Sequence, residues 1–216
     1  MRRVLCTIAS GPCAELLEIA RPSFEAFAQR HDYDLVVVGE DPAPERPPSW
    51  GRIRLMQDLL AEVDEILWLD ADTVVVDDSR DIVAELAPDD LMGMSAHVTP
   101  EGDDPIPNCG VWFLRNDPAV LALLDVVWAS DHLVDHKWWE NAAVLEALGY
   151  ELTPLVRLVD PSPLWHRVRF LGTEWNSMDV DPASAPRIVH FAGKSQAERV
   201  EGMREAASER LGVHPA

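Results

Sequence analysis

The sequence predicts an α/β fold in which helices flank a mostly parallel central β-sheet. Short apolar segments at residues 4–9, 35–38 and 66–69 lack polar alternation, which is typical of strands that are buried on both faces. Amphipathic helical patterns lie between these segments, with apolar residues three and four positions apart. Because strands and helices alternate along the chain, we expect parallel strands joined by helical crossovers.

The expected elements can be placed in order along most of the chain. Strands are expected at residues 4–9, 35–38, 66–69, 91–96, 110–114 and 188–191. Helices are expected in the segment from Leu16 to Phe27, at residues 51–62, after Pro118, and at residues 137–148 and 195–210. Residues 153–186 have no pattern that assigns an element. Ligands of such sheets bind beyond the carboxyl ends of the strands, which places Ser10-Gly11 and Asp70–Asp72 at one edge.

Acidic residues dominate the composition. The 216 residues include 18 Lys+Arg and 38 Asp+Glu, so the net charge is −20. Nucleic acids and anionic membranes are therefore excluded as partners, because both require clustered positive charge. No apolar run approaches the ~20 residues that span a bilayer, and residues 1–216 are expected to form a single domain. An odd number of cysteines without metal-type spacing favours a reduced, cytoplasmic protein: Cys6, Cys13 and Cys109.

Asp70 and Asp72 directly follow a buried strand, in the segment WLDADTVV at residues 68–75. Two carboxylates one residue apart can share a divalent cation, and their hard oxygens favour magnesium or manganese. Such a segment can also be an ordinary polar turn after a strand. Apolar residues on both sides attach the pair to rigid elements, and this favours the metal interpretation.

His190 ends the last expected strand and is followed by a glycine and a lysine in the segment IVHFAGK, residues 188–194. A neutral imidazole suits manganese better than magnesium. Gly193 allows close approach of the backbone to a phosphate, and Lys194 adds a positive point charge. A histidine at a strand end is more often a structural residue, so both interpretations stay open at this point.

Two further segments could contact a hydroxylated ligand. Before the apolar strand at residues 110–114, Asn108 offers an amide and Gly110 an open backbone, although the pair could simply form the turn into the strand. In the segment WWEN at residues 138–141, a tryptophan face can stack on a sugar ring while Glu140 bonds its hydroxyls. Most of the eight tryptophans are nevertheless expected in the core.

In their order along the chain, these segments resemble GT-A glycosyltransferases, which are nucleotide-sugar-dependent enzymes with a Rossmann-like sheet. The sequence is most similar to the α-galactosyl/α-mannosyl transferase family that includes plant xyloglucan xylosyltransferases. Glycogenin-like enzymes and bacterial lipooligosaccharide galactosyltransferases are more distant relatives. The matching segments are TIASG (7–11), SWGR (49–52), WLDADTVV (68–75), NCGVWFLRN (108–116), WWENAAV (138–144), WNS (175–177) and HFAGK (190–194).

The resemblance implies a role for each matching residue. The residues implied in donor binding are Thr7, Ile8, Ala9, Arg52, Asp70, Ala71, Asn108, Gly110, Gly193 and Lys194. Among them, Asn108 and Gly110 would line the donor sugar, and Gly193 and Lys194 would hold the diphosphate. The implied metal ligands are Asp70, Asp72 and His190, and the implied catalytic residues are Glu140, Asn141 and Lys194.

The resemblance also implies a reaction. A metal-dependent enzyme, with Mn²⁺ preferred and Mg²⁺ as the other choice, would transfer a sugar from a nucleotide-diphosphate sugar to a hydroxyl of a carbohydrate or small molecule. UDP is the favoured nucleotide, and the anomeric configuration would be retained. Two departures from the family pattern bear on the site: Arg52 replaces a usual lysine, and Glu140-Asn141 replaces a usual Asp-Gln pair.

Three other functions are compatible with parts of the sequence. The segment after Leu69 also fits a haloacid-dehalogenase-like phosphatase with Asp70 as nucleophile, but that motif normally lies on the first strand of its fold. A non-catalytic nucleotide-sugar-binding protein would tolerate the two departures. Nucleotidyl transfer is a further alternative, because such enzymes can share a related nucleotide-binding half.

Overall fold

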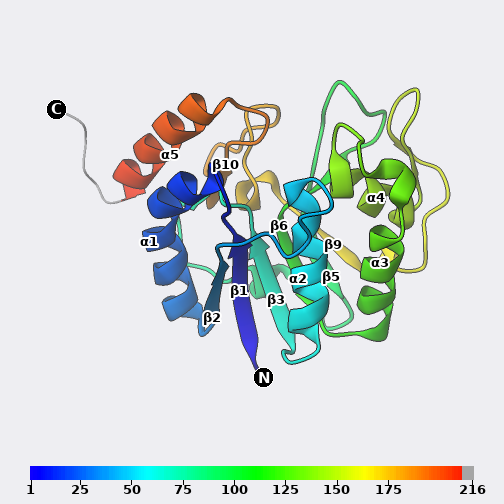
Figure 1. Ribbon diagram of the computed structural model, residues 1–216, viewed down its shortest axis with the longest axis horizontal. Coiled ribbons are helices and arrows are strands. Elements are labelled where there is room, and N and C mark those ends of the chain that lie inside the picture. The colour runs from blue at the N-terminus through cyan, green and yellow to red at the C-terminus, as the bar shows by residue number, and fades with distance from the viewer. Residues whose placement is uncertain (211–216) are drawn as a thin grey trace.

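The computed structural model describes residues 1–210 and has a six-stranded central sheet between two layers of helices (Figure 1). The strand order is β2-β1-β3-β6-β5-β9. All neighbouring strands pair in parallel except β6, which is antiparallel to both β3 and β5. The predicted mostly parallel sheet is therefore confirmed. The strands are β1 (Arg3–Ile8), β2 (Asp34–Val38), β3 (Glu65–Leu69), β5 (Met92–His97), β6 (Ile106–Arg115) and β9 (Val168–Leu171).

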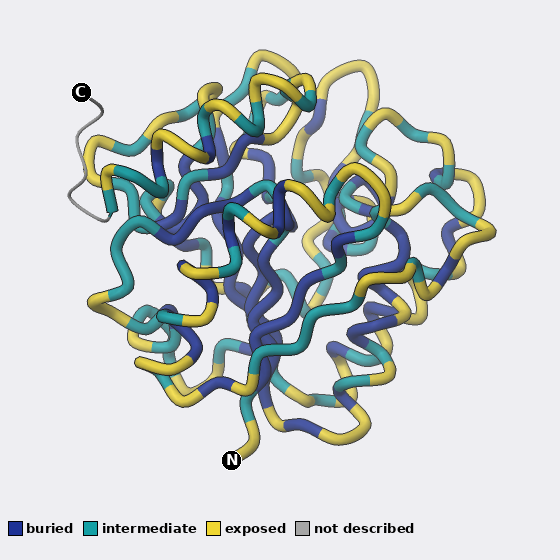
Figure 2. The backbone as a smooth tube through the Cα atoms, turned by 60° about the vertical axis from the view of Figure 1, so that its left-hand side comes forward, coloured by how far each residue is buried: buried dark blue, intermediate teal, exposed yellow. Residues whose placement is uncertain are grey.

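Helices cover both faces of the sheet. Successive side chains of its inner strands point to opposite faces and therefore enter two different cores. Ile66 and Trp68 of β3 pack with the helices of one core, whereas Leu67 and Leu69 pack with those of the other. This is why the central strands are continuous apolar runs, and Figure 2 shows them buried through the middle of the molecule. One core includes α2 (Gly51–Leu60), α3 (Pro118–Trp128) and α4 (Trp139–Leu148), and the other includes α1 (Cys13–His31) and α5 (Gln196–Arg210).

A second, two-stranded sheet brings distant parts of the chain together. Strand β4 (Thr73–Val75) follows β3 after a short turn, and it pairs antiparallel with β10 (Ile188–His190). In this pairing, His190 lies opposite Thr73. The residues after β3 and the residues at the end of β10 therefore meet at one edge of the central sheet.

Strand β4 is in none of the expected ranges, and the structure also differs from the expected elements elsewhere. The unassigned stretch 153–186 contains β9, which joins the edge of the central sheet, and β8 (Arg157–Leu158), which pairs with β7 (Tyr150–Glu151). Strand β6 starts at Ile106, earlier than expected. Helix α4 starts only at Trp139, whose φ of 46° is a left-handed conformation that interrupts a helix from Lys137.

The tryptophans are divided between the core and the surface. Trp50, Trp68, Trp112 and Trp175 are buried, and Trp139 is 47% exposed. The other three are partly buried against the core: Trp128, Trp138 and Trp165. None of the helices within residues 1–210 is long and apolar enough to cross a membrane.

Candidate metal centre and donor site

The turn Asp70-Ala71-Asp72 connects β3 to β4 and is held by backbone bonds. The Asp70 amide donates to the Gly110 carbonyl on β6 at 2.8 Å, and the Asp70 carbonyl accepts from both the amide and the hydroxyl of Thr73. The Phe191 amide donates to the Asp72 carbonyl at 3.0 Å. With the main chain fixed in this way, both carboxylates leave the sheet at the same edge.

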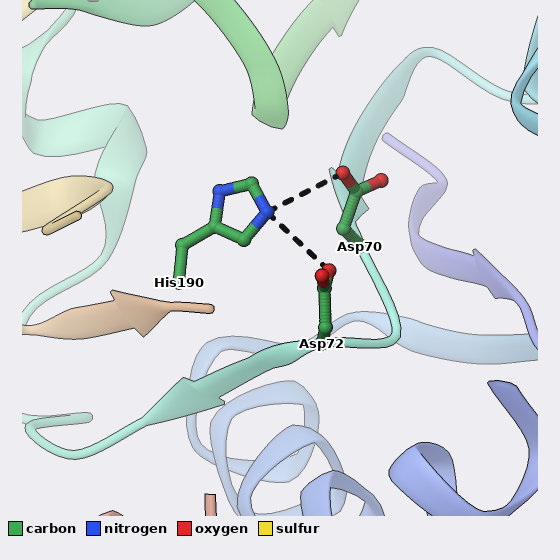
Figure 3. A group of neighbouring side chains, drawn as sticks. All are labelled: Asp70, Asp72 and His190. Atoms are coloured by element: carbon green, nitrogen blue, oxygen red, sulfur yellow. Dashed lines mark ion pairs between the residues drawn. The ribbon is translucent and has the colours of Figure 1, made fainter. Parts of the chain in front are cut away.

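The two carboxylates converge on His190 (Figure 3). His190 Nε2 lies 3.3 Å from Asp72 Oδ1 and 3.7 Å from Asp70 Oδ2. One ligand atom from each residue lies within 4.8 Å of the others. Neighbouring ligands of an octahedral ion with bonds of about 2.1 Å are about 3 Å apart, so small side-chain movements would give three ligands to one divalent cation.

The charged groups of this cluster shift one another's pKa values. Burial opposes ionisation of Asp72, but His190 and Arg199 outweigh it and lower the pKa of Asp72 to about 2. Burial also opposes protonation of His190, yet Asp72 and Asp70 outweigh it and raise the pKa of the imidazole. The ionised carboxylates therefore attract positive charge to this point, and a divalent cation would compete with the proton on Nε2.

The other oxygen of Asp70 has different partners. Asp70 Oδ1 accepts from Trp68 Nε1 at 2.7 Å and lies 2.8 Å from Arg52 Nη2. Arg52 is buried, and its Nε lies 3.2 Å from Glu140 Oε1 on α4. Burial opposes the charge of Arg52, but Asp70 and Glu140 outweigh it and raise its pKa. Arg52 was expected to bind the donor. In the structure it links Asp70 to Glu140 on α4.

Glu140 and Asn141 lie at the start of α4 and face the same region. Burial raises the pKa of Glu140 despite the opposing effect of Arg52, and within residues 1–210 its Oε2 has no hydrogen-bond partner. Both amide atoms of Asn141 are engaged: Oδ1 accepts from the Cys109 amide at 2.9 Å, and Nδ2 donates to the Pro107 carbonyl at 3.2 Å. Asn141 therefore holds the first half of β6.

Asn108 and Gly110 lie on an irregular part of β6. Met94 of β5 is opposite Trp112, but Ser95 is opposite Asn108, so the intervening residues of β6 bulge out of the pairing with β5. Bulges of this kind are common beside functional sites, where they redirect the backbone. In this part of β6, Gly110 accepts a hydrogen bond from the Asp70 amide and lies against the His190 ring.

The remaining predicted donor residues include the end of β1 and Gly193. Thr7, Ile8 and Ala9 lie at the carboxyl end of β1, beside β2, where Thr7 is fully buried and the Ala9 amide donates to the Val38 carbonyl. Gly193 has a φ of 73° and open space around its α-carbon.

Lys194 forms an ion pair outside the cluster. Its Nζ lies 2.5 Å from Asp179 Oδ2, and the Lys194 side chain is partly exposed. The ion pair raises the pKa of Lys194 through its hydrogen bond with Asp179. Asp179 therefore competes with a diphosphate for the charge of this lysine.

Two residues at the site were not predicted. Asn176 Oδ1 lies 2.9 Å from His190 Nδ1, and Arg199 Nε on α5 lies 3.3 Å from Asp72 Oδ2. Asn176 belongs to the matching segment WNS, which was a signal for it. Arg199 lies in a charged helix in which nothing distinguishes it from its neighbours.

Solved glycosyltransferase structures share this fold. A glycosyltransferase involved in the glycosylation of the major capsid of PBCV-1 has a TM-score of 0.66 and 19% identity, over 94% of this chain and 99% of that chain. Galactosyltransferase LgtC, solved with donor and acceptor sugar analogues, has a TM-score of 0.61 and 14% identity, over 95% of both chains. GlyE of Streptococcus pneumoniae TIGR4 has a TM-score of 0.59 and 14% identity, over 98% of this chain and 63% of that chain. The predicted GT-A fold is confirmed.

The sequence itself identifies the family. The profile described as nucleotide-diphospho-sugar transferase matches residues 48–201, which is more than half of the chain, and the protein belongs to that family. A comparison with curated protein sequences gives no match. The predicted glycosyltransferase class is confirmed, and the family match argues against the phosphatase alternative.

Proposed function

We propose that this protein is a metal-dependent glycosyltransferase that transfers a sugar from a UDP-sugar to an acceptor hydroxyl with retention of the anomeric configuration. The convergence of Asp70, Asp72 and His190 carries this proposal. Two carboxylates and an imidazole suit Mn²⁺, with Mg²⁺ as the alternative. The choice of UDP and of retention follows from the family resemblance.

The cluster accounts for how an acidic protein could bind an anionic donor. The net charge of −20 repels a diphosphate. A cation held by Asp70 Oδ2, Asp72 Oδ1 and His190 Nε2 would supply Lewis-acid stabilisation of the charge that develops on the leaving diphosphate. Arg199 and Arg52 lie beside the same carboxylates and add positive charge.

The residues around the cluster would orient the sugar. Asn108 Oδ1 already accepts two hydrogen bonds, so its amide nitrogen is the group that could meet a sugar hydroxyl. Glu140 is proposed beside the reacting carbon, where its carboxylate would stabilise an oxocarbenium-like sugar. Asn141 is proposed to position β6 rather than to contact the sugar. In front-face attack, the leaving phosphate would accept the proton of the attacking hydroxyl.

Donor binding and turnover test this function. Thermal-shift assays with UDP-, GDP- and dTDP-sugars, each with and without Mn²⁺, should give the largest stabilisation for a UDP-sugar with Mn²⁺. Hydrolysis of that donor should then depend on Mn²⁺, and Asp72→Asn should lower it by more than about 100-fold. Proton NMR of the first-formed sugar should show the anomeric configuration of the donor.

A control variant and an alternative substrate make the test discriminating. Asp77 lies on the same segment beyond β4 and pairs with Arg187, so Asp77→Asn should leave donor hydrolysis unchanged. Full activity of Asp72→Asn would contradict the metal site. Turnover of p-nitrophenyl phosphate that depends on Asp70 would instead support the phosphatase. The assignment of residues 1–216 to one catalytic domain and a cytoplasmic location stay predictions.

A further inference from the structure

A chain of hydrogen bonds runs from the backbone of β6 through two asparagines to His190. The Gly110 amide donates to Asn108 Oδ1 at 2.9 Å, and Asn176 Nδ2 donates to the same oxygen at 2.9 Å. Asn176 Oδ1 lies 2.9 Å from His190 Nδ1. Asn176 is fully buried and His190 is 4% exposed, so water cannot readily replace these bonds.

The direction of every bond in this chain is determined by its first member. The backbone N–H of Gly110 can only donate, so Asn108 must present its oxygen to it. That oxygen can only accept, so Asn176 must turn its NH₂ group toward Asn108 and its oxygen toward His190. His190 Nδ1 must therefore donate a proton. In the neutral imidazole the lone pair is then on Nε2, the atom that faces Asp70 and Asp72.

Gly110 also determines where the ring lies. A β-carbon on Gly110 would be 2.2 Å from His190 Cε1 and 2.5 Å from His190 Nδ1. The imidazole therefore rests directly against the glycine backbone, and only a residue without a side chain leaves room for it. The amide chain and this contact together restrict both the orientation and the protonation of the ring.

We propose that Asn176 and Asn108 are positioning residues that hold His190 as the Nδ1–H tautomer and aim its Nε2 lone pair at the cation. This proposal rests on the metal-dependent function proposed above. Loss of a group that orients a metal-binding histidine typically weakens metal binding by about 10- to 100-fold. Asn176 is the critical member, because it is the residue that accepts the proton of Nδ1.

Two substitutions of Asn176 separate positioning from packing. Asn176→Leu removes both hydrogen bonds at nearly constant volume. Asn176→Asp keeps an acceptor for His190 Nδ1 but places a second acceptor against Asn108 Oδ1. Both variants should lose stability, but only the leucine variant should lose the orientation of the ring. Asn116→Ala is the matched control. Asn116 directly follows the far end of β6, and its side-chain amide donates to the Leu60 and Val63 carbonyls.

Electron paramagnetic resonance of free Mn²⁺, titrated with protein and no donor, measures the affinity directly. Asn176→Leu should bind Mn²⁺ about 10- to 100-fold more weakly than wild type, whereas Asn176→Asp should recover most of the affinity and Asn116→Ala should lose none. Wild-type affinity in Asn176→Leu, or equally weak binding in both Asn176 variants, would overturn the proposal.

The tautomer gives a second readout that does not depend on the metal. Imidazole ¹⁵N NMR of the wild-type protein at alkaline pH, with the His190 signals assigned by their loss in His190→Gln, should show a proton on Nδ1. A proton on Nε2 would overturn the positioning role even if Mn²⁺ binds. If wild type binds no Mn²⁺, the metal-dependent function fails, and the NMR result alone then decides whether the asparagines position the ring. If Asn176→Leu does not fold, the ¹⁵N spectrum of the wild-type protein still tests whether the asparagines position the ring.

Discussion

The guanidinium Nη2 of Arg52 lies 2.8 Å from Asp70 Oδ1, while the other oxygen of Asp70 faces His190 Nε2 at 3.7 Å. The two oxygens of this carboxylate therefore have separate tasks. One is bound to Arg52 and Trp68 inside the protein, and the other points toward His190. Since Arg52 also pairs with Glu140, the position of Asp70 depends on the start of α4.

Replacement of Arg52 should show how much this link contributes to stability. Arg52→Met would leave Asp70 and the buried Glu140 without their cation, and the free energy of unfolding should fall by about 3–5 kcal/mol. Arg52→Lys keeps the charge without the planar fork, so its loss should be smaller. Urea denaturation near pH 7 measures both. The exposed Arg54 on the same helix is the control, and an equal loss in Arg54→Met would contradict the role of Arg52.

Gly110→Ala should disrupt the proposed metal site, because the new side chain would displace His190. The new β-carbon would overlap His190 Cε1 at 2.2 Å, so the ring must move, at a cost of about 1–3 kcal/mol in the free energy of unfolding. The stabilisation of the protein by Mn²⁺ in thermal-shift assays should disappear. Gly93→Ala on neighbouring β5 places its β-carbon 3.5 Å from the nearest atoms and should retain that stabilisation. If Mn²⁺ stabilises both variants equally, Gly110 does not confine the His190 ring.

Lys194 should affect donor binding but not stability. Its partner Asp179 is largely exposed to solvent, and exposed ion pairs contribute little to the free energy of unfolding. If Lys194 leaves Asp179 to bind the diphosphate, Lys194→Ala should weaken UDP binding by about 10-fold in calorimetry with Mn²⁺. Asp179→Asn frees the lysine and should not weaken binding. Unchanged affinity in Lys194→Ala would exclude this residue from the diphosphate site.

His97 should make stability depend on pH between about 6.5 and 4. Burial lowers the pKa of His97 to about 4, although Asp181 opposes this shift, and neither ring nitrogen has a hydrogen-bond partner within residues 1–210. Since the folded pKa lies below the unfolded value, the unfolded state binds the proton first as the pH falls. The free energy of unfolding should then decrease by up to about 3 kcal/mol.

Urea denaturation from pH 7 to pH 4 tests the effect of His97. His97→Gln should lose most of this decline, whereas His166→Gln, which alters an exposed histidine, should keep it. A decline that is equally steep in His97→Gln would assign the pH dependence to other groups.

The apolar pattern of the sequence was sufficient to predict the strands that helices cover on both faces. The segments that became β1, β2 and β3 are apolar runs in the sequence, because helices cover both faces of the sheet at those strands. Strand β9 was not predicted, because its arginine and the partly buried residues at the edge of the sheet interrupt the apolar pattern. The late start of α4 was missed because the left-handed conformation of Trp139 has no signal in the sequence.

The sequence alone determined the class of fold, the candidate metal ligands and the family resemblance, because each depends on residue types at fixed spacings along the chain. Only the tertiary structure decided which partners these residues have. The pairing of β4 with β10 brings His190 to Asp70 and Asp72, Gly110 leaves room for its ring because it has no side chain, and Asn176 orients it. Arg52 binds Asp70, and Lys194 binds Asp179. These contacts join residues far apart in the chain, so they depend on strand order and register, which local periodicity does not encode.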